Sequence, residues 1–334
     1  MESGQFKGAG AGVVGAGFYA PGRVVTNADL EKTVDTSDEW IVQRTGIHER
    51  RVASEGETTT AIAVAAAKAA LADAGVDGSK VGLVVVATST PDYYSPPTAT
   101  AVQHAIGAGA CAAFDIGAGC SGSLFAIVAA EQFIRSGACE YALVVGAETL
   151  SRLVDWKDRR TCIVFGDGAG AALLGRAPEG RGILCSCLMS DGGNASLITI
   201  PGLSITEEDL ERRGGVKKAT VWMEGGKVLK FASRAMASAV QAVLAKSGVS
   251  IGDVRLVIPH QANLRIIDNA ARRLGLRQDQ VYVNIGKYGN TSAASVLIAI
   301  AEALAEGRVA SGDYVVLVAF GAGLLYGAAL MRWI

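Results

Sequence analysis

The chain has 334 residues, half of them hydrophobic, which is enough for a large core and roughly two domain-sized units. Lys and Arg number 31 against 32 acidic residues, so the overall charge indicates neither nucleic acid nor an anionic membrane as a partner. The six cysteines form no CxxC pair and only three histidines accompany them, which argues against a metal site. No signal peptide is recognisable at the start, so we expect a reducing cytoplasm, where structural disulfides are rare.

Short apolar runs rich in β-branched residues alternate along the chain with alanine-rich helical stretches. In chain order, the clearest of these runs are 81–89, 141–148, 255–259 and 314–320. They are typical of strands buried on both faces, and the alternation predicts an α/β protein with largely parallel sheets. The uncharged stretch from Tyr314 to Met331 is interrupted by glycines, so we interpret it as two buried strands around a turn rather than a membrane span.

One internal repeat is visible. The stretches LADAGVDGSKVGLVV from Leu71 and LAKSGVSIGDVRLVI from Leu244 share seven residues over fifteen aligned positions. Each copy is followed by a similar stretch, FDIGAGCSGS or VNIGKYGNTS, that predicts a strand, a turn and a helix. We therefore expect two duplicated halves, residues 1–180 and 181–334, with a polar connecting insertion at about 190–226.

The stretch DIGAGCSGSLFAIVAA contains a GxGxxG pattern at Gly117, Gly119 and Gly122 between a predicted strand and a predicted helix. This pattern is compatible with a nucleotide site, and Glu148 lies about where a ribose-binding acid would. A bulky thiol at Cys120, however, would crowd a pyrophosphate. A second GxGxxG begins at Gly10 without a preceding apolar strand, and we expect it to lead into the first strand.

Cys120 is better placed as a nucleophile. A thiol at a helix N-terminus lies near unpaired N–H groups and the positive end of the helix dipole, which stabilise the thiolate and predict a lowered pKa. Two candidate partners occupy similar positions in the second half: His260 directly after a predicted strand, and Asn290 in the turn before a predicted helix. The carboxyl ends of strands in open α/β sheets bind ligands, so we expect these three side chains to lie together.

At these residues the chain resembles a known family, 3-oxoacyl-[acyl-carrier-protein] synthase III, from about Gly12 to Trp333. The resemblance is carried by the motifs DIGAGCSGSLFA, IPHQANLRII, GNTSAAS and AFGAGLLYGAAL, with TNADLEKTVDTSDEWIVQRTGIHERR near the start and FGDGAGAALL in the middle. It implies a thiolase-like fold of five layers, α-β-α-β-α, built from two similar halves and usually dimeric. It also implies the initiating condensing enzyme of type II fatty acid synthesis, located in the cytoplasm.

The resemblance implies a two-step reaction. Cys120 takes an acyl group from an acyl-CoA, and the enolate formed when malonyl-acyl carrier protein loses CO2 then attacks the acyl-cysteine. The resemblance assigns the oxyanion hole to the backbone N–H groups of Cys120 and Ala322, and the enolate contacts to His260 and Asn290. Where the family usually has three glycines, this chain has Ala322 between two. An asparagine at Asn290, where elongating relatives have a second histidine, favours the initiating class.

The resemblance also implies where the substrates bind. Thr36, Trp40, Arg44 and Arg159 would line the CoA entrance, and Gly225 and Asn263 would lie beside the pantetheine arm. Ser95 would lie in the acyl pocket, where a small side chain leaves room for primers longer or more branched than acetyl. The acyl carrier protein would dock on four basic residues: Lys230, Arg265, Arg272 and Arg273. The substrates are acyl-CoA and malonyl-acyl carrier protein, with no cofactor and no metal.

Two alternatives from other functional classes remain at this stage. The glycine pattern at Gly117 to Gly122 is compatible with an NAD-dependent oxidoreductase. The second alternative is a non-catalytic acyl-binding or scaffold relative of the family. Transfer of a labelled acyl group to Cys120 distinguishes both from a condensing enzyme.

Overall fold

Two mixed β-sheets form the framework of the computed structural model, which describes residues 10–215 and 219–334. Residues 1–9, where no signal peptide is expected, lie outside the described residues. The first sheet has the strand order β1 (Gly10–Tyr19), β7 (Gly168–Ala177), β6 (Tyr141–Glu148), β4 (Val81–Ala87), β5 (Ala112–Ile116). The second has the order β11 (Val254–Pro259), β12 (Tyr314–Gly321), β13 (Leu325–Arg332), β8 (Gly182–Ser190).

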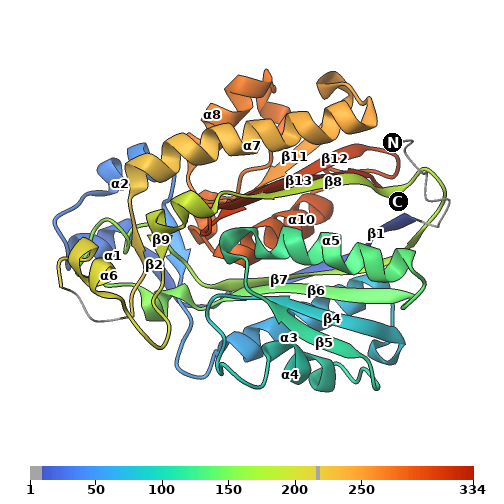
Figure 1. Ribbon diagram of the computed structural model, residues 1–334, viewed down its shortest axis with the longest axis horizontal. Helices are drawn as coiled ribbons and strands as arrows, with labels where there is room; N and C mark the ends of the chain where they lie inside the picture. Colours follow the sequence, from blue (N-terminus) through green and yellow to red (C-terminus); the bar gives the residue numbers. More distant parts are fainter. Residues whose placement is uncertain (1–9, 216–218) are drawn as a thin grey trace.

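Helices cover both faces of each sheet and so complete five layers. The helices α5 (Gly122–Arg135) and α10 (Ser295–Ala305) are packed between the two sheets. One outer layer is α3 (Thr59–Ala74) with α4 (Thr98–Ala105), and the other is α7 (Gly225–Ser247) with α8 (Leu264–Leu274). Figure 1 shows these layers stacked from α8 and α7 down to α3 and α4. The predicted α-β-α-β-α architecture is confirmed.

Close packing between the layers depends on small residues. Gly170 of β7 has no room for a side chain, because an added Cβ would lie 2.6 Å from the backbone nitrogen of Ile298 on α10. Gly146 of β6 is equally tight, at 2.3 Å from the carbonyl oxygen of Ala293. These contacts bring the segment that begins α10 against the carboxyl end of the first sheet, where the candidate residues lie.

The sheets are less parallel than the sequence predicts. The strand pairs β4–β5, β4–β6 and β11–β12 are parallel, whereas β1–β7, β6–β7, β12–β13 and β13–β8 are antiparallel. The prediction of largely parallel sheets is therefore wrong. Helices on both faces bury the antiparallel strands as fully as the parallel ones, so both kinds have the same continuous apolar pattern. The strands β12 and β13, joined by a glycine-bearing turn, are the two predicted within 314–331.

The N-terminal glycine pattern lies inside β1 rather than before it. An added Cβ at Gly15 would come within 2.6 Å of the Ala70 carbonyl oxygen, and one at Gly17 within 2.4 Å of the Ala70 nitrogen. Gly15 and Gly17 allow α3 to pack directly on the strand, while Gly10 and Gly12 pack against the 181–182 segment, so close packing explains the pattern without a nucleotide.

The first sheet takes all its strands from before residue 180 and the second takes all its strands from after it. The division into halves at 180 itself stays a prediction. The insertion at about 190–226 contains β9 (Ile198–Thr199), α6 (Glu207–Arg212) and β10 (Trp222–Met223). It is not wholly polar, because Leu197 and Val221 are buried in hydrophobic clusters.

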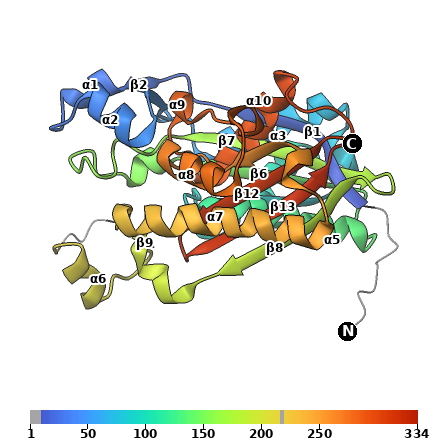
Figure 2. The ribbon, with the colours of Figure 1, turned by 90° about the horizontal axis from the view of Figure 1, so that it is seen from above.

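The remaining elements are short and gather at one end of the layers. They are β2 (Val24–Thr26), α1 (Asn27–Glu31), α2 (Asp38–Thr45), β3 (Glu49–Arg51) and α9 (Ile285–Tyr288). Figures 1 and 2 both show α1, α2, α6 and β9 at this end. The helix α7 is long and apolar enough to cross a membrane, but it packs on the second sheet and on α8, which accounts for its apolar character.

Candidate active site

Cys120 lies in a short 3₁₀ turn, Gly119–Ser121, between the end of β5 and the start of α5. Gly119 has φ 51°, a left-handed conformation that favours glycine, and the Ser121 hydroxyl donates to the Ala118 carbonyl oxygen at 2.8 Å. The turn packs against the end of β12 and against a second 3₁₀ turn, Ser292–Ala294. Cys120 is thus held at the junction of the two sheets.

His260 directly follows β11, as the sequence predicts. Asn290 does not follow a strand, because the stretch VNIGKYGNTS forms α9 and a loop. Its backbone hydrogen bonds are made elsewhere: Asn290 pairs with the 164–166 segment, where its N–H donates to the Val164 carbonyl oxygen at 2.9 Å. The predicted strand in the second repeat is therefore wrong, although the position of the asparagine is retained.

One cavity brings the three predicted catalytic residues together. It has a volume of about 120 Å³, and its lining includes Cys120, His260, Asn290 and Ala322. The predicted substrate contacts Gly225 and Asn263 also line it. Apolar side chains of the insertion and of α7 form much of the remaining wall, including Ile198, Val221, Met223 and Val228.

The imidazole of His260 is fully buried and has one free nitrogen. Nδ1 pairs with the hydroxyl of Ser295, at the start of α10, at 2.6 Å, and the ring packs edge-on against Phe320. Within the described chain, Nε2 has no hydrogen-bond partner. Burial lowers the pKa of His260 to about 3, so the ring is neutral at physiological pH. A neutral ring with Nδ1 occupied by Ser295 leaves Nε2 available to a substrate.

The side chain of Asn290 is oriented by its neighbour. Its Oδ1 accepts a hydrogen bond at 2.8 Å from the backbone N–H of Ser292, which leaves the amide N–H groups for the cavity. Ser292 has φ 49° and is the only non-glycine residue with positive φ among residues 10–215 and 219–334. Strained backbone of this kind persists where the surrounding structure imposes it, and it is concentrated at functional sites.

The predicted lowering of the Cys120 pKa is wrong for the substrate-free site. Burial raises the pKa of the Cys120 thiol to about 11, and the nearby Glu148 carboxylate adds to the rise. A hydrogen bond with Ser292 opposes this change in part. Desolvation of a thiolate in the apolar cavity is the largest effect on the Cys120 pKa. The resting thiol is protonated at neutral pH.

The backbone beside Cys120 can form the predicted oxyanion hole. An added Cβ on Gly321 would lie 2.7 Å from the Cys120 nitrogen, and one on Gly119 would lie 3.0 Å from the Ala322 nitrogen. The two N–H groups therefore belong to segments in direct contact. Ala322 has no positive φ, so the alanine in place of the usual glycine fits without strain.

Glu148 is not available to a ribose. The carboxylate is fully buried and accepts hydrogen bonds from the hydroxyls of Thr90 and Ser292, at 2.8 and 2.9 Å, and from the Ser89 backbone N–H. At Gly122 an added Cβ would lie 3.0 Å from the Ala87 Cβ. Gly119 and Gly122 are therefore explained by the conformation and packing of the Cys120 turn, whereas an added Cβ at Gly117 would meet nothing within 4 Å. In residues 10–215 and 219–334, no group of three or more His, Cys, Asp or Glu side chains could hold a metal ion.

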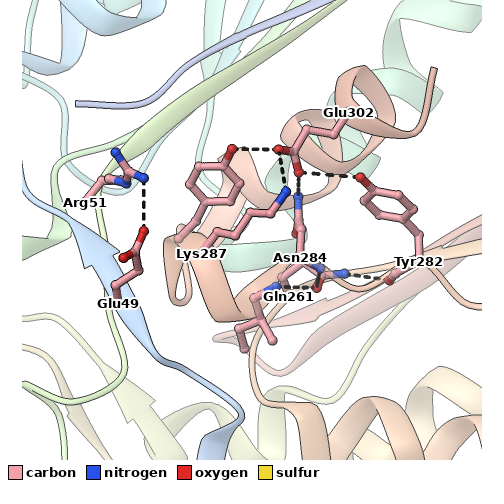
Figure 3. Close-up of polar contacts among 9 residues, drawn as sticks. Glu49, Arg51, Gln261, Tyr282, Asn284, Lys287 and Glu302 are labelled. Atoms are coloured by element: carbon pink, nitrogen blue, oxygen red, sulfur yellow. Dashed lines mark hydrogen bonds and ion pairs between the residues drawn. The ribbon is translucent and has the colours of Figure 1, made fainter. Parts of the chain in front are cut away.

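A second layer of polar contacts supports the loops that carry the site. Gln261 donates to the Tyr282 carbonyl oxygen at 3.1 Å and accepts from the Asn284 backbone N–H at 3.0 Å. The Asn284 side chain donates in turn to Glu302 on α10 at 2.7 Å, as Figure 3 shows. This network connects the loop after His260 to the loop that leads to Asn290.

The predicted CoA-entrance residues cluster around Trp40, outside the cavity. The guanidinium groups of Arg44 and Arg159 lie 4.5 and 5.3 Å from the centre of its ring. Arg159 also donates to the carbonyl oxygen of Asp35 at 2.8 Å, next to Thr36. The cluster is joined to the cavity wall because Asn263 donates to the Arg44 carbonyl oxygen at 3.1 Å.

Ser95 does not line the Cys120 cavity. It is exposed and lies on the rim of a neighbouring, larger cavity of about 1510 Å³, which shares Ser89, Gly119 and Ala322 with the first. The exposed side chains of Tyr93 and Tyr94 flank it there.

Three of the four predicted basic residues line one groove between α7 and α8. The groove has a volume of about 510 Å³ and includes Lys230, Arg272 and Arg273. Arg265 lies on α8 but does not line it. Arg234, one turn after Lys230 on α7, does, and sequence reasoning missed it although its spacing of four residues was visible.

Sequence reasoning also missed two residues that contact the catalytic candidates, and a third that lies behind one of them. Ser292 and Ser295 were visible only as part of the motif GNTSAAS, and Glu148 was assigned to a different ligand. The sequence signal that could have identified Glu148 was a carboxylate at the end of an apolar strand. Its partners could not be predicted because they come from two distant segments, one at Ser89 and Thr90 and the other at Ser292.

Comparison with known proteins agrees with this geometry. The chain matches the family described as 3-oxoacyl-[acyl-carrier-protein (ACP)] synthase III over residues 114–192, and the C-terminal part of that family over 244–333. It is 49% identical to the beta-ketoacyl-[acyl-carrier-protein] synthase III of Symbiobacterium thermophilum over 326 residues, covering 96% of this chain and 98% of that protein. The corresponding enzyme of Caldanaerobacter subterraneus is 47% identical over 327 residues, with 97% and 98% covered.

The crystal structure of 3-oxoacyl-[acyl-carrier-protein] synthase III from Aquifex aeolicus superposes with a TM-score of 0.91 at 45% identity, covering 97% of this chain and all of that one. Fold and site together define a condensing enzyme of the thiolase-like class, an acyltransferase. The chain belongs to the 3-oxoacyl-[acyl-carrier-protein] synthase III family. These relatives do not favour the oxidoreductase or the non-catalytic scaffold.

Proposed function

We propose that this enzyme joins an acyl group from a short or branched acyl-CoA to the two-carbon unit of malonyl-acyl carrier protein, releasing CoA and CO2 and initiating fatty acid synthesis. The observation that supports this most strongly is the cavity itself. It combines a thiol, a neutral imidazole with a free nitrogen and an oriented amide. That set suits thioester chemistry followed by stabilisation of a negative oxygen.

In the first half-reaction, the Cys120 sulfur attacks the carbonyl carbon of the acyl-CoA. The backbone N–H groups of Cys120 and Ala322 hold the negative oxygen of the tetrahedral intermediate. The bond from that carbon to the CoA sulfur then breaks, and CoA leaves as the thiol. The product is an acyl group held on Cys120 as a thioester.

In the second half-reaction, the malonyl group loses CO2 and its electrons form an enolate. His260 Nε2 and the Asn290 amide donate hydrogen bonds to the enolate oxygen. The enolate carbon attacks the acyl thioester and releases Cys120. Because burial lowers the pKa of His260 to about 3, the ring donates as a neutral group and does not quench the carbanion by protonation.

For substrate entry, we propose that Trp40 stacks on the adenine of CoA while Arg44 and Arg159 lie near its phosphates, with Thr36 beside them. Gly225 and Asn263 flank the pantetheine arm where it enters the cavity. Asn263 also caps α8 by accepting from the Arg265 N–H at 2.9 Å, so its side chain is held in place.

The groove between α7 and α8 is the proposed docking site for the acidic acyl carrier protein. Its basic residues are exposed, on a chain whose net charge is only −1. Attraction between exposed charges speeds encounter and weakens with salt, because screening acts over about 8 Å at physiological ionic strength.

We expect Arg272→Glu combined with Arg273→Glu to raise the KM for malonyl-acyl carrier protein about tenfold or more, because two attractive charges become repulsive. Self-acylation from acyl-CoA should change less than about twofold. Lys68→Glu, the same kind of charge change on α3 in the opposite outer layer, is the matched control. An equal effect on the use of both substrates, or no effect on either, would show that the carrier protein docks elsewhere.

The proposal also covers cofactors, cellular location, oligomeric state, partners and the two halves of the chain. The enzyme uses no metal or organic cofactor, acts in the cytoplasm and forms a homodimer, with neither nucleic acid nor membrane as a partner. Residues 1–180 and 181–334 form its two duplicated halves.

A panel of acyl-CoA primers assayed with malonyl-acyl carrier protein tests the function as a whole. We expect 3-oxoacyl-acyl carrier protein and CO2 in equal amounts from short and branched primers. Reduction of a nicotinamide cofactor, or no condensation with any primer, would contradict it.

A further inference from the structure

The proposed first half-reaction leaves the thiol proton of Cys120 without an acceptor. His260 is a poor candidate, because burial lowers its pKa to about 3. The cavity is otherwise mostly apolar, so a nearby base must lie in its wall or beneath it.

Glu148 lies beneath the wall, on the far side of Ser292. The Ser292 hydroxyl donates to one carboxylate oxygen of Glu148 at 2.9 Å, and Ser292 lines the same cavity as Cys120, whose turn packs against the turn that begins at Ser292. The carboxylate is fully buried and does not line the cavity, so Ser292 is the link between it and the sulfur.

The groups around Glu148 are arranged for a carboxylate. Thr90 and Ser292 donate through hydroxyls, and the backbone N–H groups of Ser89 and Ala293 point at it. In the part of the chain that the structure describes, no Lys, Arg or His forms an ion pair with it. The Cys120 thiol is near enough for the charge of Glu148 to raise its pKa, and it shares the cavity with Ser292.

The backbone conformation of Ser292 is the second observation that supports a role for this residue. Its φ of 49° directs the backbone N–H to Asn290 and the hydroxyl to Glu148 at the same time. A left-handed conformation is unfavourable for serine and is retained here where glycine would be easier. The Ser292 hydroxyl makes its contact with Glu148 from this strained position.

We propose that Ser292 and Glu148 form a proton relay that activates Cys120 for acylation, a step that rests on the proposed function. As the sulfur attacks the thioester carbon, its proton passes to the Ser292 oxygen and the Ser292 hydroxyl proton passes to Glu148. When the bond between that carbon and the CoA sulfur breaks, the leaving thiolate takes a proton back through Ser292. The step is a thioester exchange without oxidation or reduction, and Glu148 ends as the carboxylate.

Burial raises the pKa of Glu148 to about 7. A raised pKa means that the carboxylate, the form able to accept a proton, is lost as pH falls below about 7. Acylation in the wild type should therefore rise with pH up to about 7 and then level off.

The test is the rate of acyl transfer from acetyl-CoA to Cys120, followed by intact mass between pH 5.5 and 9. We expect Glu148→Gln to slow acylation about 30-fold or more and to remove the plateau above pH 7, so that the rate keeps rising with pH. Ser292→Ala, which keeps the N–H contact to Asn290, should give the same profile. Decarboxylation by enzyme that is already acylated should fall much less in both variants.

Glu131→Gln is the matched control, because Glu131 is a buried carboxylate on α5 that does not line the cavity. Acylation by Glu148→Gln within about threefold of wild type with the plateau retained would overturn the relay. Equal loss of both half-reactions with an unchanged pH profile would overturn it in favour of a structural role. If Glu148→Gln does not fold, Ser292→Ala decides by the same criteria. Failure of the wild type to acylate Cys120 would instead overturn the proposed function, and the relay with it.

Discussion

Cys120→Ser should abolish condensation, with the rate of 3-oxoacyl product formation reduced at least about 10³-fold. The side chain keeps nearly the same size and position, so the cavity and its partners remain. A serine hydroxyl is much harder to ionise than a thiol, and the ester it would form is a poorer acyl donor to the enolate. The measurement is product formation from acetyl-CoA and malonyl-acyl carrier protein.

The control for this variant is a second cysteine that lies outside the cavity. Cys187 on β8 contacts the Ala239 carbonyl oxygen through its sulfur, and Cys187→Ser should retain condensation. Near wild-type product formation by Cys120→Ser would show that the thiol is not the nucleophile.

His260→Ala and Asn290→Ala should separate the two half-reactions. Both variants should still accept an acyl group on Cys120, because neither side chain belongs to the oxyanion hole of acyl transfer. Each should lose decarboxylation of malonyl-acyl carrier protein by about 10²-fold or more, the usual effect of removing a donor to a developing negative oxygen. Release of CO2 and the mass of the acyl-enzyme measure the two steps independently.

Two further expected results test the role of His260 in decarboxylation. Because the lowered pKa of His260 keeps the ring neutral above about pH 3, decarboxylation should show no dependence on its titration between about pH 5 and 8. Ser295→Ala, which removes the hydroxyl at Nδ1, should impair decarboxylation and leave the acylation plateau in place. Parallel loss of acylation and decarboxylation in both alanine variants would refute the division of roles.

The five-layered fold could be predicted from sequence because its signals are local or repeated. The helix–strand repeat from Leu71 and from Leu244 can be recognised in the sequence alone, and so can the apolar strands. Strand direction was not predictable, since β6 and β7 are buried alike whichever way they run. The strand expected near Val283 failed because the backbone N–H groups of Asn284 and Ile285 donate to the Gln261 side chain, a contact between distant parts of the chain.

Part of the site could also be predicted from the sequence. His260 directly follows a strand and Cys120 lies in the turn after one. Strand ends gather at one edge, so their meeting in one cavity follows from local pattern. The direction of the Cys120 pKa shift was not predictable, because it depends on how deeply other segments bury the thiol. The same limit applies to Ser292 and Glu148, whose contact joins residues 144 positions apart.

The central claim is that Cys120 carries the acyl group between the two half-reactions. The most direct measurement is the mass of the enzyme after incubation with acetyl-CoA alone, followed by digestion to locate any added group. We expect one acetyl group on the peptide that contains Cys120, its release when malonyl-acyl carrier protein is added, and none on Cys120→Ser. An unmodified enzyme that still condenses, or an acetyl group on another residue, would contradict the account.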